Sequence, residues 1–186
     1  MPCMKTRMAL VAAAAIATLA LAAAAVAGTI TATAVVSGAG SMSMTSGSSA
    51  TMTDTLDGTD QTVSWSIPLS VDDARGTGAG WNLTATSTTF DDGVGDSLPS
   101  DASQIASVAA ACNSGGSCST PTNAISYPIN LPAGATAPTA IKFFNSATST
   151  GMGDFTITPT FDVSIPGNSY SGTYTSTVTF AAVTGP

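Results

Sequence analysis

The sequence predicts an all-β fold, an antiparallel two-sheet β-sandwich of the Ig-like or jelly-roll type, preceded by an N-terminal hydrophobic signal segment. Thr, Ser, Val, Ala and Gly dominate from Thr29 onward, and no stretch there combines helical spacing with good helix formers. Several segments alternate apolar and polar residues with the two-residue period of a half-buried strand. Clusters of Gly, Pro, Asn and Asp between these segments mark turns. A sandwich is therefore favoured, with a closed barrel as the alternative.

Residues 1–27 are predicted to be a secretory signal peptide. Lys5 and Arg7 give the segment a positive start, and an apolar run of 19 residues, Met8–Val26, follows. The run ends in a small-x-small pattern at Ala25–Ala27, which predicts cleavage after Ala27. A run of this length can also just span a bilayer, so a retained membrane anchor is the rival interpretation.

Residues 28–186 are predicted to form a single acidic domain. Arg75 and Lys142 face 11 carboxylates there, all of them Asp, which gives a formal charge of −9. Such a chain repels nucleic acid and anionic lipid headgroups. The sequence has no histidine, which excludes Ser-His-Asp and Cys-His catalysis and His-ligated zinc. An enzyme would need a pair of carboxylates, and no Asp spacing selects one, so we expect a non-catalytic protein without a cofactor.

The first half of the domain contains two clear strand patterns. Apolar side chains occupy alternate positions from Val63 to Val71, with Trp65 among them, and the same alternation returns at Trp81–Ala85 after a glycine-rich connection. A short helical turn is expected at Ser100–Ala111. Weaker strands are expected at Thr29–Val36, Ala50–Leu56, Ser126–Asn130 and Thr139–Phe144.

The C-terminal part predicts a β-hairpin. Phe155–Ile165 carries apolar residues or proline at every odd position, and Pro159 in its middle suggests an edge or bulged strand because proline cannot donate to a ladder. A turn at Pro166–Asn168 is followed by Tyr170–Phe180, with Tyr170, Tyr174, Val178 and Phe180 on one face.

Two cysteines of the predicted domain should form a disulfide. Cys3 leaves with the leader, so Cys112 and Cys118 remain as an even pair separated by a Gly-containing pentapeptide. An exported chain can keep such a pair oxidised. The loop is short, so the disulfide should constrain a local loop and contribute about 2 to 3 kcal/mol in the loop-entropy model.

Several motifs of the predicted domain together resemble those of one known protein family. Asp73–Leu83 places a glycine-rich loop before the triplet Trp81-Asn82-Leu83, and Gly172–Phe180 resembles the distal motif that accompanies it. Further similarity lies in the Gly-Met-Gly of Thr150–Phe155 and in the turn Ile165–Asn168. The family is that of WxL-domain proteins, and the resemblance covers most of residues 60–186.

This resemblance implies a secreted, surface-located domain of Gram-positive type that associates non-covalently with the cell wall, through peptidoglycan. It also implies binding roles for the motif residues Trp81, Leu83, Tyr174 and Phe180, the last standing where the family usually has a second Trp. The sequence pattern around these residues also allows structural roles in place of binding roles. Trp81 is in phase with Leu83, which favours a core position, and Tyr174 resembles a tyrosine corner, whose hydroxyl bonds to nearby backbone.

Acidic residues form two further clusters. Asp91, Asp92 and Asp96 surround two glycines and are a weak calcium candidate, because calcium prefers oxygen ligands on a tight loop. The sequence matches no complete EF-hand, and a solvated acidic turn is the favoured interpretation. Asp72 or Asp73 should form a salt bridge with Arg75 nearby.

Two functions are compatible with these observations. The first is a non-catalytic surface domain that associates with the cell wall, with peptidoglycan or other surface proteins as partners, no nucleic acid, and a membrane only if the leader is retained. The alternative is a structural subunit of a surface fibre or coat, since the C-terminal strands also resemble those of pilin-like and coat-type sandwiches.

Overall fold

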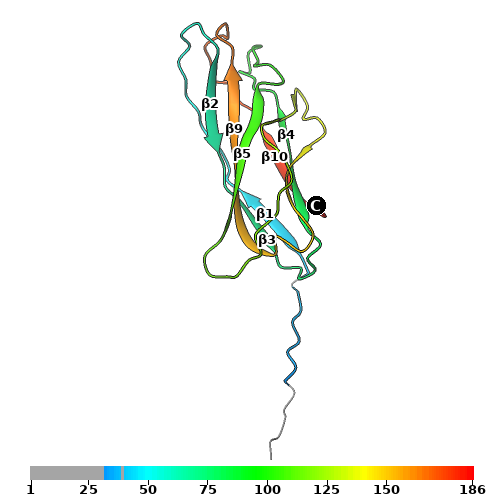
Figure 1. Ribbon diagram of the computed structural model, residues 1–186. Coiled ribbons are helices and arrows are strands. Elements are labelled where there is room, and N and C mark those ends of the chain that lie inside the picture. Colours follow the sequence, from blue (N-terminus) through cyan, green and yellow to red (C-terminus); the bar gives the residue numbers. More distant parts are fainter. Residues whose placement is uncertain (1–31, 39) are drawn as a thin grey trace, which may run out of the picture. The chain divides into compact units, whose positions relative to one another are not determined.

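The computed structural model describes residues 32–38 and 40–186 (Figure 1). The chain divides into two units, Met1–Val35 and Val36–Pro186. In the first unit the described residues are exposed and outside regular structure, and the predicted signal peptide lies outside the described residues. Among the residues that the structure describes, no helix is long and apolar enough to cross a membrane.

The second unit is a sandwich of two β-sheets, which confirms the predicted fold class. The first sheet is built on β9, the longest strand, which pairs with β5 along one edge and with β2 and then β3 along the other. Figure 1 shows β2, β9 and β5 side by side. The strands of this sheet are β1 (Met42–Ser46), β2 (Gln61–Ser66), β3 (Leu69–Asp73), β5 (Ser103–Cys112), β6 (Ile129–Asn130) and β9 (Gly153–Ile165).

The second sheet is built on β4. β10 pairs with one edge of β4, while β8 and the short β7 share the other. All pairs in both sheets are antiparallel except β4 with β7, which covers two residues. The strands of this sheet are β4 (Trp81–Thr88), β7 (Ala133–Gly134), β8 (Ile141–Ser146) and β10 (Val178–Thr184).

Pro159 lies in the middle of a central strand, so of the two predicted alternatives the edge strand is wrong, whereas a pairing irregularity of the bulge type does lie nearby, in β5. β2 ends opposite Thr160 and β3 begins opposite Ile157, so Pro159 falls where the partner changes from one strand to the next. On that edge no strand residue pairs with Pro159, so the missing N–H is tolerated, while Val108 of β5 pairs with it on the other edge. The pairing register of β5 also shifts nearby, between Ile105 and Ser107.

The predicted C-terminal hairpin is wrong, because the strand that follows β9 does not pair with it. Both edges of β9 are occupied, and the chain after Ile165 therefore crosses to the second sheet, where β10 pairs with β4. Only Val178–Phe180 of the predicted return strand belongs to β10, and Tyr170–Thr177 forms a connecting loop.

Other segments also depart from the sequence predictions. The expected helical turn at Ser100–Ala111 is wrong: most of it lies in β5, because pairing with β9 outweighs the weak helical preference of Ala and Ser. Ala50–Leu56 forms no strand, and the described part of Thr29–Val36 forms none either. The strands expected at Ser126–Asn130 and Thr139–Phe144 are confirmed in part by β6 and β8, respectively.

The core lies between the two sheets and is rich in aromatic rings. Phe161 of the first sheet contacts Phe180 of the second, with ring centroids 6.1 Å apart. Phe161 also stacks on Trp65, with ring centroids 4.3 Å apart, so the partly buried Trp65 packs against the core. The alternating burial of β2 and β3 confirms the predicted strand pattern at Val63–Val71.

Trp81 begins β4 and is completely buried, with 0% of its surface exposed. Its Nε1–H donates to the carbonyl oxygen of Gly151 at 2.8 Å, and its ring packs against Phe144 and Phe155. Gly151 has φ of 68°, and a Cβ there would lie 2.8 Å from the indole nitrogen. Ser146 side-chain atoms are closer still, so Gly151 is required by its positive φ and by the close approach of Ser146 and Trp81.

Cys112 and Cys118 form the predicted disulfide. The bridge closes the loop that follows β5, and Asn113 at its start is held to Asp154 by a backbone and a side-chain hydrogen bond. The disulfide therefore acts locally, at the end of the sandwich where β9 begins.

We expect Trp81→Ala to lower the free energy of unfolding by about 3 to 5 kcal/mol, because it removes a fully buried ring. Trp81→Phe keeps most of the apolar volume but leaves the Gly151 carbonyl without its donor, and should cost about 1 to 3 kcal/mol. Urea denaturation followed by circular dichroism measures both. A loss below about 1 kcal/mol for Trp81→Ala would contradict the buried position.

Candidate binding site

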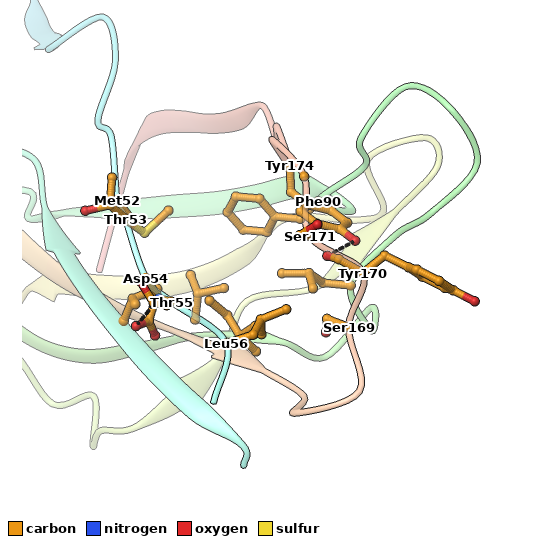
Figure 2. A pocket seen from close by; sticks show the side chains of 15 residues that line it. Met52, Thr53, Asp54, Thr55, Leu56, Phe90, Ser169, Tyr170, Ser171 and Tyr174 are labelled. Atoms are coloured by element: carbon orange, nitrogen blue, oxygen red, sulfur yellow. Dashed lines mark hydrogen bonds between the residues drawn. The ribbon is translucent and has the colours of Figure 1, made fainter. Parts of the chain in front are cut away.

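A groove of about 470 Å³ opens at the end of the sandwich where β2 begins and β9 ends. Its floor is apolar: Val63, Val163 and Ile165 come from the first sheet, and Phe90 and Leu98 come from the loop segment after β4. The segment Met52–Leu56 forms one wall and the loop Ser169–Tyr174 the other, as Figure 2 shows.

The rim of the groove carries hydroxyl groups, a carboxylate and aromatic rings. Asp54 is its one acidic lining residue, and its Oδ1 accepts a hydrogen bond from the Thr55 N–H at 2.8 Å. Tyr170 is 71% exposed, and Figure 2 shows its ring extending away from the groove floor into solvent. The rim hydroxyls belong to Thr53, Thr55, Ser169, Ser171, Tyr170 and Tyr174.

Tyr174 fixes the loop that forms one wall of the groove. Its hydroxyl donates to the carbonyl oxygen of Tyr170 at 3.0 Å, which confirms the predicted tyrosine corner. Desolvation raises the pKa of the Tyr174 phenol, and the negative charges of Asp96 and Asp92 add to the increase. Thr175 exchanges backbone hydrogen bonds with Asp91 at 2.9 and 3.0 Å, which ties the loop to the acidic turn.

The acidic turn at Asp91–Asp96 uses its carboxylates to cap backbone N–H groups. Asp92 Oδ1 accepts from Val94, Gly95 and Asp96 at 2.9 to 3.1 Å, and Asp91 Oδ1 accepts from Gly93 at 2.7 Å. The same bonds lower the pKa of Asp92. These bonds confirm the interpretation as a capped acidic turn, and no group of three metal-binding side chains occurs in the described part of the chain.

Three of the predicted binding residues lie in the core or pack against it. Trp81 and Leu83 are fully buried in β4, and Phe180 packs against Phe143 and Phe161. Tyr174 is the predicted residue that lines the groove. Any effect of Trp81 or Leu83 on binding would in this structure be transmitted through the fold, because neither side chain reaches solvent.

Sequence reasoning did not single out the other groove residues. Met52 and Phe90 lie in loops at the level of the groove, and only their packing in the cluster with Val163 and Ile165 reveals them. Tyr170 was the one detectable signal, because it is a large aromatic residue between turn residues.

Asp73 and Arg75 form the predicted salt bridge at the opposite end of the molecule. The Arg75 guanidinium donates to both oxygens of the buried Asp73 carboxylate at 2.7 and 2.9 Å, and also to the carbonyl of Gly80 at 2.8 Å. The hydrogen bonds from Arg75 hold the pKa of Asp73 below its ordinary value, against the effect of burial. The pair therefore fixes the glycine-rich loop that leads into Trp81.

A family model described as the WxL domain, surface cell wall-binding, matches residues 40–179. The matched range contains Trp81, the cysteine pair and every residue that lines the groove. No curated protein and no solved structure matches the chain.

We expect Tyr174→Phe to lower the free energy of unfolding by about 0.5 to 1.5 kcal/mol, because the hydrogen bond to the Tyr170 carbonyl is lost. Tyr170→Phe is the matched control: Tyr170 contributes only its carbonyl to this bond, so its hydroxyl should be dispensable. Urea denaturation of both variants measures the difference, and equal stability of the two would contradict the tyrosine corner.

Asp73→Asn should reduce stability at pH 7 by about 1 to 3 kcal/mol and weaken its dependence on acid. The folded-state pKa of Asp73 lies below the ordinary value of 3.8, so its contribution is present above that value. It is lost as the pH falls through the lower, folded-state pKa. Denaturation midpoints between about pH 2 and 7 test this, with exposed Asp72→Asn as the control. An unchanged acid dependence in Asp73→Asn would contradict the prediction.

Proposed function

Because the chain belongs to the WxL family of surface cell-wall-binding domains, we propose that it is secreted and non-catalytic and that its terminal groove contacts wall peptidoglycan. As a WxL domain it is a cell-wall-binding protein of the cell surface. Secretion would follow cleavage of the leader after Ala27 and would release residues 28–186 as one domain.

The groove is the observation that supports a binding role. A ligand site is concave, mostly apolar at its floor and equipped with a few polar groups that fix orientation. The floor formed by Val63, Phe90 and Val163 and the hydroxyl groups of the rim meet this description. Sugar rings combine an apolar face with peripheral hydroxyls, so an aromatic and hydroxyl-rich groove suits them.

The composition of the groove favours binding without catalysis. Hydrolysis of a glycosidic bond by the common mechanism requires two carboxyl groups on either side of the scissile bond. Within the described residues the groove lining supplies one carboxylate, Asp54, and the chain has no histidine to act as a base. Asp91 and Asp92 nearby are engaged in capping the acidic turn.

The experiment is co-sedimentation of the secreted chain with isolated Gram-positive sacculi. We expect the chain to pellet, and Tyr170→Ala to weaken binding by about two- to tenfold, the effect of one aromatic contact of about 0.5 to 1.5 kcal/mol. Val183→Ala is the matched control, because Val183 is also exposed but lies on β10 near the opposite end.

Three other outcomes are informative. If the chain stays in the supernatant, autonomous wall binding is wrong. If it pellets and Tyr170→Ala and Val183→Ala both behave as the parent chain, the wall contact lies away from the Tyr170 rim. Release of soluble sugar from the sacculi would contradict the non-catalytic assignment.

A further inference from the structure

The charges of the domain are divided between its two ends. Seven of the 11 aspartates lie in the loops at the groove end, where β2 and β5 begin and where β4 and β9 end. They belong to the segment before β2, to the acidic turn and to the segment before β5. These residues are Asp54, Asp57, Asp60, Asp91, Asp92, Asp96 and Asp101.

The cations of the described residues lie elsewhere and are engaged. Arg75 is paired with Asp73 at 2.7 Å where β3 ends. Lys142 on β8 donates to the carbonyl oxygen of Pro186, beyond the end of β10. The partner of Arg75, Asp73, pairs with Gly153 at the start of β9. The partner of Lys142, Pro186, follows Thr184, which pairs with Trp81 at the start of β4. Both cations are therefore directed to the end opposite the groove, where β9 and β4 begin. No Lys or Arg lines the groove in the part of the chain that is described.

This distribution restricts what the groove can bind. A phosphate-bearing polymer would approach a surface of uniform negative charge with no cation to pair with its phosphates, and the repulsion would extend over about 8 to 10 Å in physiological salt. An uncharged saccharide would meet no such barrier. Neither wall of the groove is a strand, so the two walls offer no ladder edge to an extended peptide.

We propose that the groove binds an uncharged glycan segment of the wall and that the acidic groove end excludes phosphate-bearing anionic wall polymers. This inference rests on the proposed function and names the ligand class of the same site. The apolar floor and the Tyr170 rim would provide the attraction, and the seven aspartates the selectivity.

The test compares binding to intact walls with binding to walls stripped of phosphate-bearing polymers, at low and at high salt. Stripped walls should bind more tightly at low salt, with little salt dependence. Binding to intact walls should be weaker at low salt and should increase with salt as the repulsion is screened. Tighter binding to intact walls, or loss of that binding as salt is added, would overturn the inference.

Two charge reversals supply a matched comparison. Asp101 and Asp72 are both exposed, neither makes a side-chain hydrogen bond within the described residues, and they lie near opposite ends of β9. Asp101→Lys should increase the affinity for intact walls at low salt by roughly two- to fivefold and leave binding to stripped walls unchanged. Asp72→Lys makes the same change in net charge and should alter neither the affinity for intact walls nor that for stripped walls.

The outcomes separate this inference from the proposed function. Absence of pelleting with both wall preparations at every salt concentration would overturn wall binding itself. Pelleting with equal affinity for both preparations, or an equal gain from Asp101→Lys and Asp72→Lys, would keep wall binding and overturn selectivity by the groove end.

Discussion

The pairing of both edges of β9 is the constraint on which the rest of the architecture depends. β5 occupies one edge, β2 and β3 share the other, and the chain after Ile165 has no edge of β9 left to pair with. It must cross to the second sheet, where β10 joins β4. The crossing loop carries Tyr170 and Tyr174, so the same constraint that builds the sandwich also provides one wall of the groove.

The two ends of the sandwich differ in structure: one is held by buried contacts, and the other carries the exposed groove. At one end Trp81 is buried against Gly151, and Arg75 holds the loop before it through Asp73. These contacts join segments far apart in the sequence and stabilise the ends of β4 and β9. At the other end the hydrogen bonds of Tyr174 and the acidic turn are largely exposed, and the surface is concave and carries no cation in the described residues. The motifs of the family thus largely build the scaffold, and the groove lies at the far end of β4.

Local sequence patterns predicted the positions of the strands better than they predicted which strands pair with one another. The alternation at Val63–Val71, at Trp81–Ala85 and at Phe155–Ile165 identified strands correctly, and the cysteine spacing identified the disulfide. The hairpin failed because alternation shows which face of a strand is buried and not which strand lies beside it. The groove could not be predicted from the sequence either, because Met52–Leu56 and Phe90 come together only after the two sheets pack.

We propose that the groove end contacts the wall while the Trp81 end maintains the fold. Hydrogen–deuterium exchange of the secreted chain, free and bound to sacculi, tests it most directly. Binding should slow exchange at Met52–Leu56 and in the Ser169–Tyr174 loop and leave the exchange of the amides around Gly151 unchanged. Protection confined to the Gly151 region, with unchanged exchange at both walls of the groove, would contradict it.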